Sequence, residues 1–369
     1  MKGILACVLA LGLVACTDSA DPPTPTSDPS SMTVVTPPPP ASISTSTSPS
    51  TTSSAASPSS TASPPESTTT TLPPIGDVEE FPIPGNRPHD VAVAPDGTVW
   101  YTAQRSGSLD RLDPVTGEVT QVPLGGGSAP HGVITGPDGA AWVTDQGLNA
   151  LVRVDHESLA VEVFPADVDV SMHTAAFAPS GTLWFTGQQG YVGHFDPDSQ
   201  SMELFETGGG GPYGITVTPV GDVYFAALAG SYIGRVDPER GEITRLDPPT
   251  ADQGARRVWT DSAGRIWVSY WNTGHLALYE PEAATWTEWR LPGENPQAYA
   301  VYVDQTDRPW VSDFGGDHAL LRFDPATETF ESVPLPTPGG EVRQILGRPG
   351  EVWGAESAAD ALIVVPYGG

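Results

Sequence analysis

Cysteine and lysine are almost absent from this chain of 369 residues. Its two cysteines are Cys7 and Cys16, and Lys2 is its only lysine. Because no cysteine follows Cys16, the rest of the chain has no disulfide and no thiolate metal site, and any metal there must bind imidazole, carboxylate or carbonyl groups. The formal net charge is −29, and the arginines are scattered without a basic stripe. We therefore expect no nucleic-acid partner.

Residues 1–16 have the pattern of a bacterial lipoprotein signal peptide. Lys2 precedes an apolar stretch from Ile4 to Val14, which is too short to remain as a membrane-spanning helix. Small residues then precede Cys16, as in the bacterial lipobox. We expect Cys16 to be the lipidated first residue of the mature protein, on the extracytoplasmic face of the cell membrane. The alternative is plain secretion with a free cysteine.

Residues 17–74 consist mainly of serine, threonine and proline. Such a segment has too little apolar surface to offset the entropy lost on ordering. The composition predicts a disordered stalk, extended by its polyproline content. Its hydroxyl groups are either decorated with O-linked sugars or left bare.

A repeat dominates the chain after residue 75. An aromatic residue recurs at intervals of 40 to 43 residues, at Trp100, Trp142, Trp184, Tyr224, Trp267, Trp310 and Trp353. The anchor lies in the second of two strand-like runs that flank a tight turn such as Pro95-Asp96-Gly97. Two further runs follow it and flank a turn such as Asp113-Pro114. No stretch shows helical periodicity. Residues 75–369 are therefore predicted to form an all-β, seven-bladed β-propeller with four-stranded blades.

The last unit of the repeat is incomplete. Residues 342–367 supply three strands, whereas residues 77–83 form a strand-like segment that has no blade of its own. We expect residues 77–83 to be the fourth strand of the last blade. Pairing the two ends of the domain in one sheet closes the ring and leaves no free edge.

Two rings of equivalent positions are the candidate functional residues. The first ring lies eleven positions before each aromatic anchor, where the innermost strand begins, and comprises His89, His131, His173, Tyr213, Arg256, Tyr299 and Val342, with Arg343 adjacent. Three histidines in consecutive blades could share a ligand or a metal ion, or each could simply bond to water or a backbone carbonyl. The second ring, three positions after each anchor, comprises Ala103, Asp145, Gly187, Ala227, Tyr270, Asp313 and Glu356.

Asp145 is the carboxylate that shares a blade with a histidine, His131. An imidazole beside a carboxylate or its metal ion is a minimal acid–base pair. Alternatively, an aspartate after a strand caps a turn, which fits Asp313 and Glu356 equally well.

The sequence resembles the virginiamycin B lyase, or streptogramin lyase, family. The resemblance rests on repeated segments, here Pro130-His131-Gly132, Pro137-Asp138-Gly139-Ala140-Ala141-Trp142 and Ile233-Gly234-Arg235-Val236-Asp237. It implies that His131 is the catalytic histidine, that Asp145 replaces a metal-binding glutamate, and that His89 contacts substrate. It also implies a divalent ion, Mg²⁺ in the family, although Ala129 stands where the family has its other metal-binding glutamate.

The leading interpretation is a lyase-like propeller that binds a small molecule at a channel mouth and opens a cyclic ester by metal-assisted β-elimination. His89, His173, Tyr213, Arg256 and Tyr299 are the expected ligand contacts, His131 the catalytic base and Asp145 the metal ligand. One alternative is a non-catalytic lipoprotein that captures a ligand or a partner protein; another is a metal-dependent lactonase. We expect a monomer that touches the membrane through its lipid anchor alone.

The assignment of Cys16 can be tested in the native host. Globomycin blocks the signal peptidase that cleaves before a lipidated cysteine, so treated cells should accumulate the unprocessed precursor. The measurement is an immunoblot of treated and untreated cells. Unchanged processing would show that residues 1–16 are an ordinary secretion signal.

Overall fold

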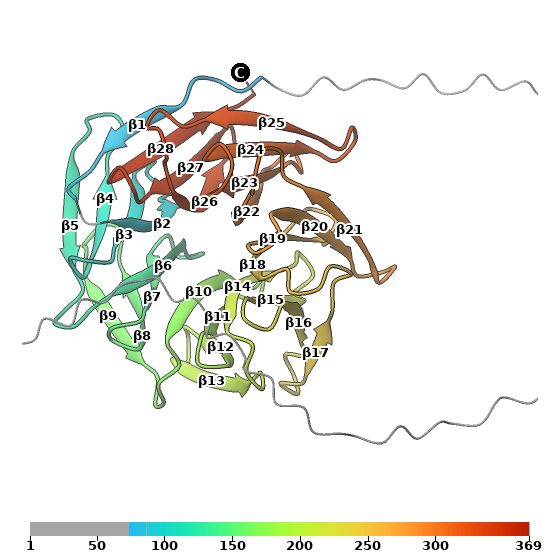
Figure 1. Ribbon diagram of the computed structural model, residues 1–369. Coiled ribbons are helices and arrows are strands. Elements are labelled where there is room, and N and C mark those ends of the chain that lie inside the picture. The colour runs from blue at the N-terminus through green and yellow to red at the C-terminus, as the bar shows by residue number, and fades with distance from the viewer. Residues whose placement is uncertain (1–73, 86, 369) are drawn as a thin grey trace, which may run out of the picture. The chain divides into compact units, whose positions relative to one another are not determined.

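The computed structural model describes residues 74–85 and 87–368. These residues form 28 strands and no helix, in seven four-stranded antiparallel sheets placed around a central axis (Figure 1). The prediction of an all-β, seven-bladed propeller is confirmed. The predicted signal peptide, Cys16 and all but the last residue of the predicted stalk lie outside the described residues. Within the described part of the chain, no helix is long and apolar enough to cross a membrane.

Six blades run outward from the axis in chain order, and the last runs β26, β27, β28 and then β1. The innermost strands are β2 (Pro88–Val93), β6 (Pro130–Thr135), β10 (Met172–Phe177), β14 (Pro212–Val217), β18 (Ala255–Thr260), β22 (Ala298–Val303) and β26 (Val342–Arg348). The second strands are β3 (Val99–Ala103), β7 (Ala141–Asp145), β11 (Leu183–Gly187), β15 (Val223–Ala227), β19 (Ile266–Tyr270), β23 (Pro309–Asp313) and β27 (Glu351–Glu356).

The third strands are β4 (Ser108–Leu112), β8 (Ala150–Val154), β12 (Tyr191–Asp196), β16 (Tyr232–Val236), β20 (His275–Glu280), β24 (Ala319–Asp324) and β28 (Ala361–Pro366). The outer strands are β5 (Val119–Pro123), β9 (Val161–Pro165), β13 (Ser201–Glu206), β17 (Ile243–Leu246), β21 (Thr285–Arg290), β25 (Thr329–Pro334) and β1 (Glu79–Pro82). The outer strands are the most exposed. Their polar and apolar residues alternate, as expected for a strand with one face toward solvent.

The repeated aromatic residue joins each blade to the next. Trp100, in the first blade, is fully buried and packs with Val133 and Val143 of the second blade. Trp267 likewise packs with Val301, from the blade that follows its own. All seven aromatic anchors are at most 4% exposed. The repeat in the sequence therefore marks the side chains that hold neighbouring sheets face to face.

The two ends of the domain close the ring. Strand β1 pairs antiparallel with β28, from Glu79 opposite Val364 to Pro82 opposite Ala361, and Ile75 forms a further bridge with Tyr367. Figure 1 shows β1 in light blue beside the red β28. The predicted closing strand is confirmed, with observed bounds of Glu79–Pro82 inside the predicted 77–83.

We expect loss of β1 to destabilise the domain strongly. Phe81 and Ile83 pack into the core of the closing blade, and burying side chains of this size is worth about 1.5–3 kcal/mol each. A chain that begins at residue 85 should therefore lose at least about 3 kcal/mol of unfolding free energy relative to one that begins at residue 74. Urea denaturation of the two chains measures the difference. Coincident unfolding curves would show that the ring does not depend on this strand.

Candidate functional site

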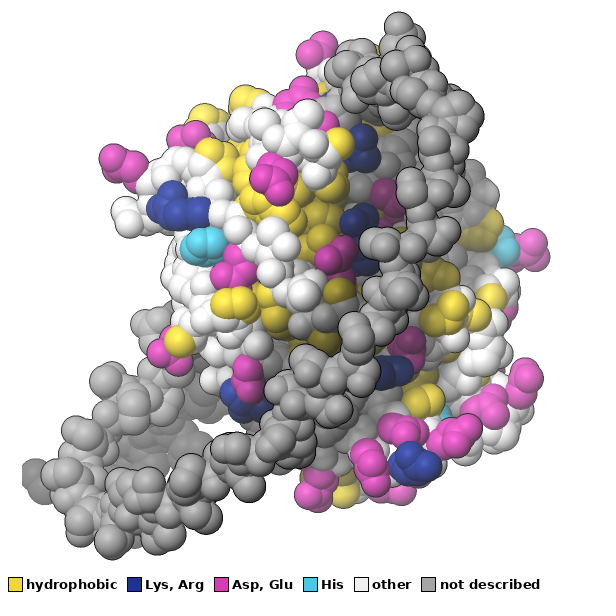
Figure 2. All heavy atoms as spheres, turned by 90° about the vertical axis from the view of Figure 1, so that its right-hand side faces the viewer, with side chains coloured by type: hydrophobic (Ala, Val, Ile, Leu, Met, Phe, Trp, Pro, Cys, Tyr) yellow, Lys and Arg dark blue, Asp and Glu magenta, His cyan; other side chains and the backbone are white. Residues whose placement is uncertain are grey.

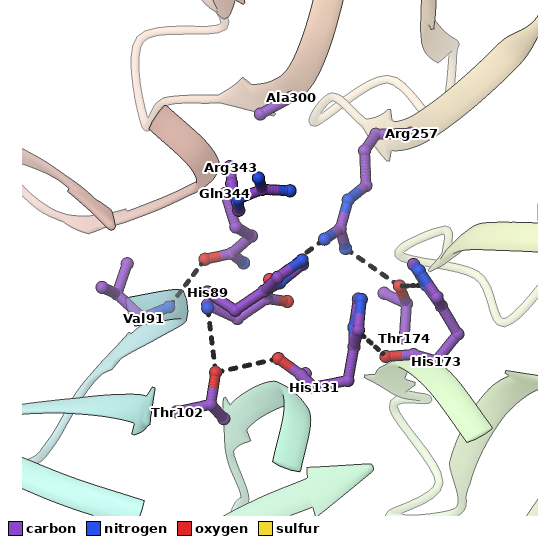
Figure 3. Close-up of polar contacts among 12 residues, drawn as sticks. His89, Val91, Thr102, His131, His173, Thr174, Arg257, Ala300, Arg343 and Gln344 are labelled. Carbon is purple, nitrogen blue, oxygen red and sulfur yellow. Dashed lines mark hydrogen bonds and ion pairs between the residues drawn. The ribbon is translucent and has the colours of Figure 1, made fainter. Parts of the chain in front are cut away.

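A β-bulge at the start of every innermost strand shapes one mouth of the central channel. In all seven blades the register shifts after the first residue of that strand, as between Pro88 and Val91 in β2. A bulge leaves residues without a cross-strand partner and re-aims their side chains. In six blades the second and third residues of the innermost strand have no partner in the ladder, and in β6 only the second residue, His131, has none. Their side chains gather at the axis (Figure 3).

The second residues form the ring predicted from the sequence, with one change. Its members are His89, His131, His173, Tyr213, Arg256, Tyr299 and Arg343. The spacing of eleven positions pointed to Val342 in the last blade, which is wrong. Val342 is the first residue of β26 and pairs with Glu356, as Pro130 pairs with Asp145. The β26–β27 hairpin is one residue shorter than the others, so Arg343 precedes its anchor, Trp353, by ten positions.

The three histidine rings contact one another at tilted angles of 47° and 41°. The ring centroids of His89 and His131 are 3.8 Å apart, as are those of His131 and His173, and all three residues are at most 5% exposed. Nδ1 of His131 lies 3.1 Å from the carbonyl oxygen of His173, and Nδ1 of His173 lies 3.2 Å from that of Tyr213. A carbonyl only accepts, so Nδ1 carries the proton in His131 and its Nε2 keeps a lone pair. Nδ1 of His173 also lies 2.9 Å from the Thr174 hydroxyl, which can either donate or accept.

The environment keeps these imidazoles neutral. Burial lowers the pKa of His89, His131 and His173 well below the ordinary 6.5, and nearby positive charge lowers it further. For His89 that charge comes from Arg343, Arg257 and Arg256. Nε2 of His173 is buried without a hydrogen-bond partner among the described residues. The histidine side of the mouth thus offers neutral imidazoles rather than imidazolium cations.

The other side of the mouth is cationic and aromatic. The guanidinium carbon of Arg256 lies 3.7 Å from the ring centroid of Tyr299 and 4.5 Å from that of Tyr213. Nη2 of Arg256 donates to the Tyr213 hydroxyl at 2.7 Å, and the two tyrosine oxygens are 3.0 Å apart. Burial raises the pKa of Tyr299, but Arg256, Arg343 and Arg257 outweigh burial and lower it to about 8.

The third residues of the innermost strands form a second polar layer that sequence reasoning missed. Arg257 donates to Asp90 at 3.0 Å across the channel and to Thr174 at 2.9 Å, and Gln344 accepts from the amide of Val91 at 3.0 Å (Figure 3). Asp90 also accepts from Nδ1 of His89 at 2.8 Å. These side chains line a cavity of about 20 Å³, room for about one water-sized group. In the sequence, these third residues directly follow the ring residues, so the same repeat could have located them.

Hydroxyl groups on the second strands hold the bulges in place. Thr144 accepts from the bulged amide of Gly132 at 3.0 Å and donates to the carbonyl of His173 in the next blade at 2.6 Å. Thr102 does the same between Asp90 and His131. A Thr or Ser stands two positions after the anchor in five of the seven blades, at Thr102, Thr144, Thr186, Ser269 and Ser312. The recurrence of a hydroxyl residue at this position is visible in the sequence.

Asp145 lies in the same blade as His131, but its carboxylate caps neighbouring turns. Its two carboxylate oxygens accept from the hydroxyl of Ser128 and from the amides of Ala129 and Leu148, and the residue is fully buried. Asp313 and Glu356 accept from turn amides in the same way. All three carboxylates therefore occupy the turn-capping geometry that was the alternative interpretation of this ring.

The residues at the mouth do not fit a divalent cation. Mg²⁺ requires charged oxygen ligands, whereas Asp145 is committed to its turn and Ala129 offers no carboxylate. Within the described residues, His89, Asp90 and His131 present ligand atoms within 4.8 Å of one another, a nitrogen-rich set of the kind Zn²⁺ prefers. However, the carboxylate of Asp90 already binds Arg257, and an ion there would lie beside a buried guanidinium. We therefore derive no step through a metal ion.

We expect the Thr144 hydroxyl to be essential to the frame of the mouth. Thr144→Val keeps the shape but leaves the amide of Gly132 without its partner and removes a donor from the carbonyl of His173. An unsatisfied buried group costs about 1–3 kcal/mol, whereas Thr144→Ser, which keeps the hydroxyl, should cost about 1 kcal/mol for the lost methyl group. Denaturant unfolding compares the two variants. Equal losses would mean that the methyl group, not the bridge, matters.

Comparison with known proteins agrees with this architecture. A structure of streptogramin B lyase superposes with a TM-score of 0.72 at 19% identity, covering 79% of this chain and 97% of that one. A catalytically inactive histidine-to-alanine variant of virginiamycin B lyase from Staphylococcus aureus, with quinupristin, gives 0.73 at 19% identity and covers 79% and 99%. The extracellular domain of a hybrid two-component system from B. thetaiotaomicron gives 0.64 at 15% identity and covers 79% and 43%.

These structural matches show a shared fold. No curated protein sequence matches the chain significantly. The model of the Virginiamycin B lyase family, in contrast, matches residues 65–288, which is more than half of the chain. This chain therefore belongs to the virginiamycin B lyase family.

Proposed function

We propose that this protein is an extracytoplasmic, lipid-anchored propeller that binds a small molecule at the ring mouth, defined here as the ring from His89 to Arg343. The observation that carries the proposal is the set of buried nitrogens that converge there without partners. Nε2 of His173 and Nε of Arg256 are both buried and unbonded among the described residues. A buried polar group without a hydrogen-bond partner destabilises the protein, and a ligand that bonds to it would remove that penalty.

The proposed location rests on the N-terminal sequence. The apolar stretch followed by small residues and Cys16 is the pattern of a lipoprotein signal. A structural relative from B. thetaiotaomicron is itself an extracellular domain. Residues 17–74 would then separate the propeller from the membrane surface.

The chemistry that this mouth supports best is β-elimination from an ester. Nε2 of His131 would remove a proton from the carbon next to a carbonyl group; a carbon–carbon double bond forms, the carbon–oxygen bond to the ester breaks, and a carboxylate leaves with the electron pair. The imidazole suits this step because it is neutral and its proton sits on Nδ1. No water or other reagent is consumed.

The charge that develops in this reaction would be stabilised by the chain's own arginines. Arg256, Arg257 and Arg343 lie close enough to shift the pKa of Tyr299. A guanidinium held in a low-dielectric site stabilises an enolate or a carboxylate. The mouth therefore has cationic groups available for the role that a divalent ion plays when it polarises a carbonyl.

One observation favours binding without turnover as the second candidate. The ring side chains are packed against one another, with centroid separations of 3.7 Å between His173 and Tyr213 and 3.8 Å between the histidines. A ligand must either sit on this ring or spread it. A capture protein needs only the first of these.

A cyclic ester distinguishes the candidates. Elimination opens quinupristin, or another cyclic ester, to a linear product of unchanged mass, because the ring opening is an isomerisation. A lactonase product is heavier by one water. Mass spectrometry of the reaction should show the unchanged mass, and His131→Ala should abolish turnover by removing the base.

The matched control for this test is His156→Ala. His156 lies in the turn after β8, remote from the ring in the fold, and its carbonyl contact with Arg111 survives the change. It should retain full turnover. Ligand binding without any product, lost in His131→Ala, would favour the capture protein, and a hydrated product would establish hydrolysis.

A further inference from the structure

We infer that the ligand of the ring mouth is a small molecule that carries a carboxylate next to a flat apolar group, with the carboxylate on Arg256. The juxtaposition that supports this is a guanidinium among aromatic rings with no carboxylate to neutralise it. The inference rests on the proposed function, since it requires that the mouth bind a ligand, and it goes further by naming the ligand's charge and shape.

Arg256 has no acidic partner among the described residues. Its guanidinium carbon lies 3.7 Å from the ring centroid of Tyr299, 4.5 Å from that of Tyr213 and 4.6 Å from that of Trp271. It donates to a neutral hydroxyl oxygen, that of Tyr213, at 2.7 Å, and its Nε is buried without a partner. A mostly buried charge is normally paired. A bound carboxylate would supply the missing partner.

The rest of the mouth does not neutralise this charge. Arg257 is matched by Asp90 at 3.0 Å, and Arg343 has Glu341 at the rim, 3.4 Å away. Arg256 therefore leaves an excess of positive charge. The pKa of Tyr299 reflects this excess of positive charge. Burial raises that pKa, but the guanidinium groups lower it to about 8. A site that favours a phenolate over a phenol also favours the anion of a ligand.

Access and shape come from the rim next to Arg256. Arg256 and Trp271 are partly exposed, whereas Tyr299 is 1% exposed. Trp271 meets Phe314 edge to face at 5.7 Å, and Phe314 stacks on Tyr299 at 4.3 Å. These rings form an aromatic wall beside the guanidinium. A flat apolar group can pack on such a wall while its carboxylate reaches Arg256.

The outer surface makes this local charge selective. The chain carries a net charge of −29, and acidic side chains are spread over the face seen in Figure 2. A positive site on an acidic protein attracts a single small anion at short range, but repels polyanions at longer range. This excludes a nucleic acid or an anionic lipid surface as the occupant.

Benzoate and benzamide are the matched probes. They share the flat ring and differ in charge, so isothermal titration of the full mature chain should show binding of benzoate at least about tenfold tighter than of benzamide. Inorganic phosphate, which lacks the ring, should bind more weakly than benzoate. Arg256→Gln should weaken benzoate binding at least about tenfold and leave benzamide nearly unchanged.

The control variant is Arg245→Gln. Arg245 also covers a tyrosine, with its guanidinium carbon 4.3 Å from the ring centroid of Tyr232, but it is half exposed and already paired with Asp247 at 2.6 Å. It should bind benzoate like the wild type. Thermal unfolding of each variant confirms that it is folded before its affinity is compared.

A pH series provides a readout that needs no change at Arg256. Four titratable or charged groups face Tyr299, namely Arg256, Arg257, Arg343 and Tyr213. When Tyr299 ionises it competes with the bound carboxylate for these guanidinium groups, so benzoate affinity should fall as the pH rises through about 8. Tyr299→Phe should remove that dependence.

Three results would overturn the inference: no benzoate binding, equal affinity for benzoate and benzamide, or unchanged benzoate binding in Arg256→Gln. Equal affinities that are both lost in His131→Ala would retain the mouth as the ligand site and remove only the preference for an anion. Failure of every probe to bind, together with failure of the cyclic ester to react, would remove the proposed function as well.

Discussion

The mouth of this propeller depends on one small interaction, the hydroxyl that in four of the seven blades ties the bulge to the next blade. A bulge frees two side chains from the pleat but leaves a backbone amide without its ladder partner. Thr144 satisfies that amide and, through its own proton, the carbonyl of the next ring residue. The same hydroxyl thus offsets the unpaired amide of the bulge and links neighbouring blades close to the ring, where the imidazole centroids lie 3.8 Å apart.

The sequence predicted the frame better than the site, for physical reasons. Aromatic anchors and tight turns act locally and recur, so the blades and the closing strand could be located from spacing alone. The residues of the ring could be predicted for the same reason. That prediction was wrong only at Val342, because the last hairpin is one residue shorter and the equivalent position is Arg343. The contact between Arg257 and Asp90 joins residues 167 positions apart, and no local pattern encodes a contact across the channel.

Electrostatics divides the mouth into two halves with different chemistry. Three neutral imidazoles come from consecutive blades, and two ring arginines with two tyrosines come from the remainder. The carboxylates of Asp145, Asp313 and Glu356 do not balance this charge, because they accept from turn amides. The positive charge of the mouth is thus a consequence of how the turns are built as much as of the arginines themselves. A change that released one of those carboxylates would also unravel its turn.

The hydroxyl bridge is missing from three blades, and this has a mechanical consequence. Ala226 and Ala355 stand where the others have Thr or Ser, and Ser312 accepts from the amide of Ala300 without reaching the next blade among the described residues. The bridges of Thr102, Thr144 and Thr186 join the first four blades into one arc, and that of Ser269 joins the fifth blade to the sixth. We expect each bridged arc to move as one piece, so the ring should yield first at its untied seams, two of which separate the three histidines from Arg256 and Arg343.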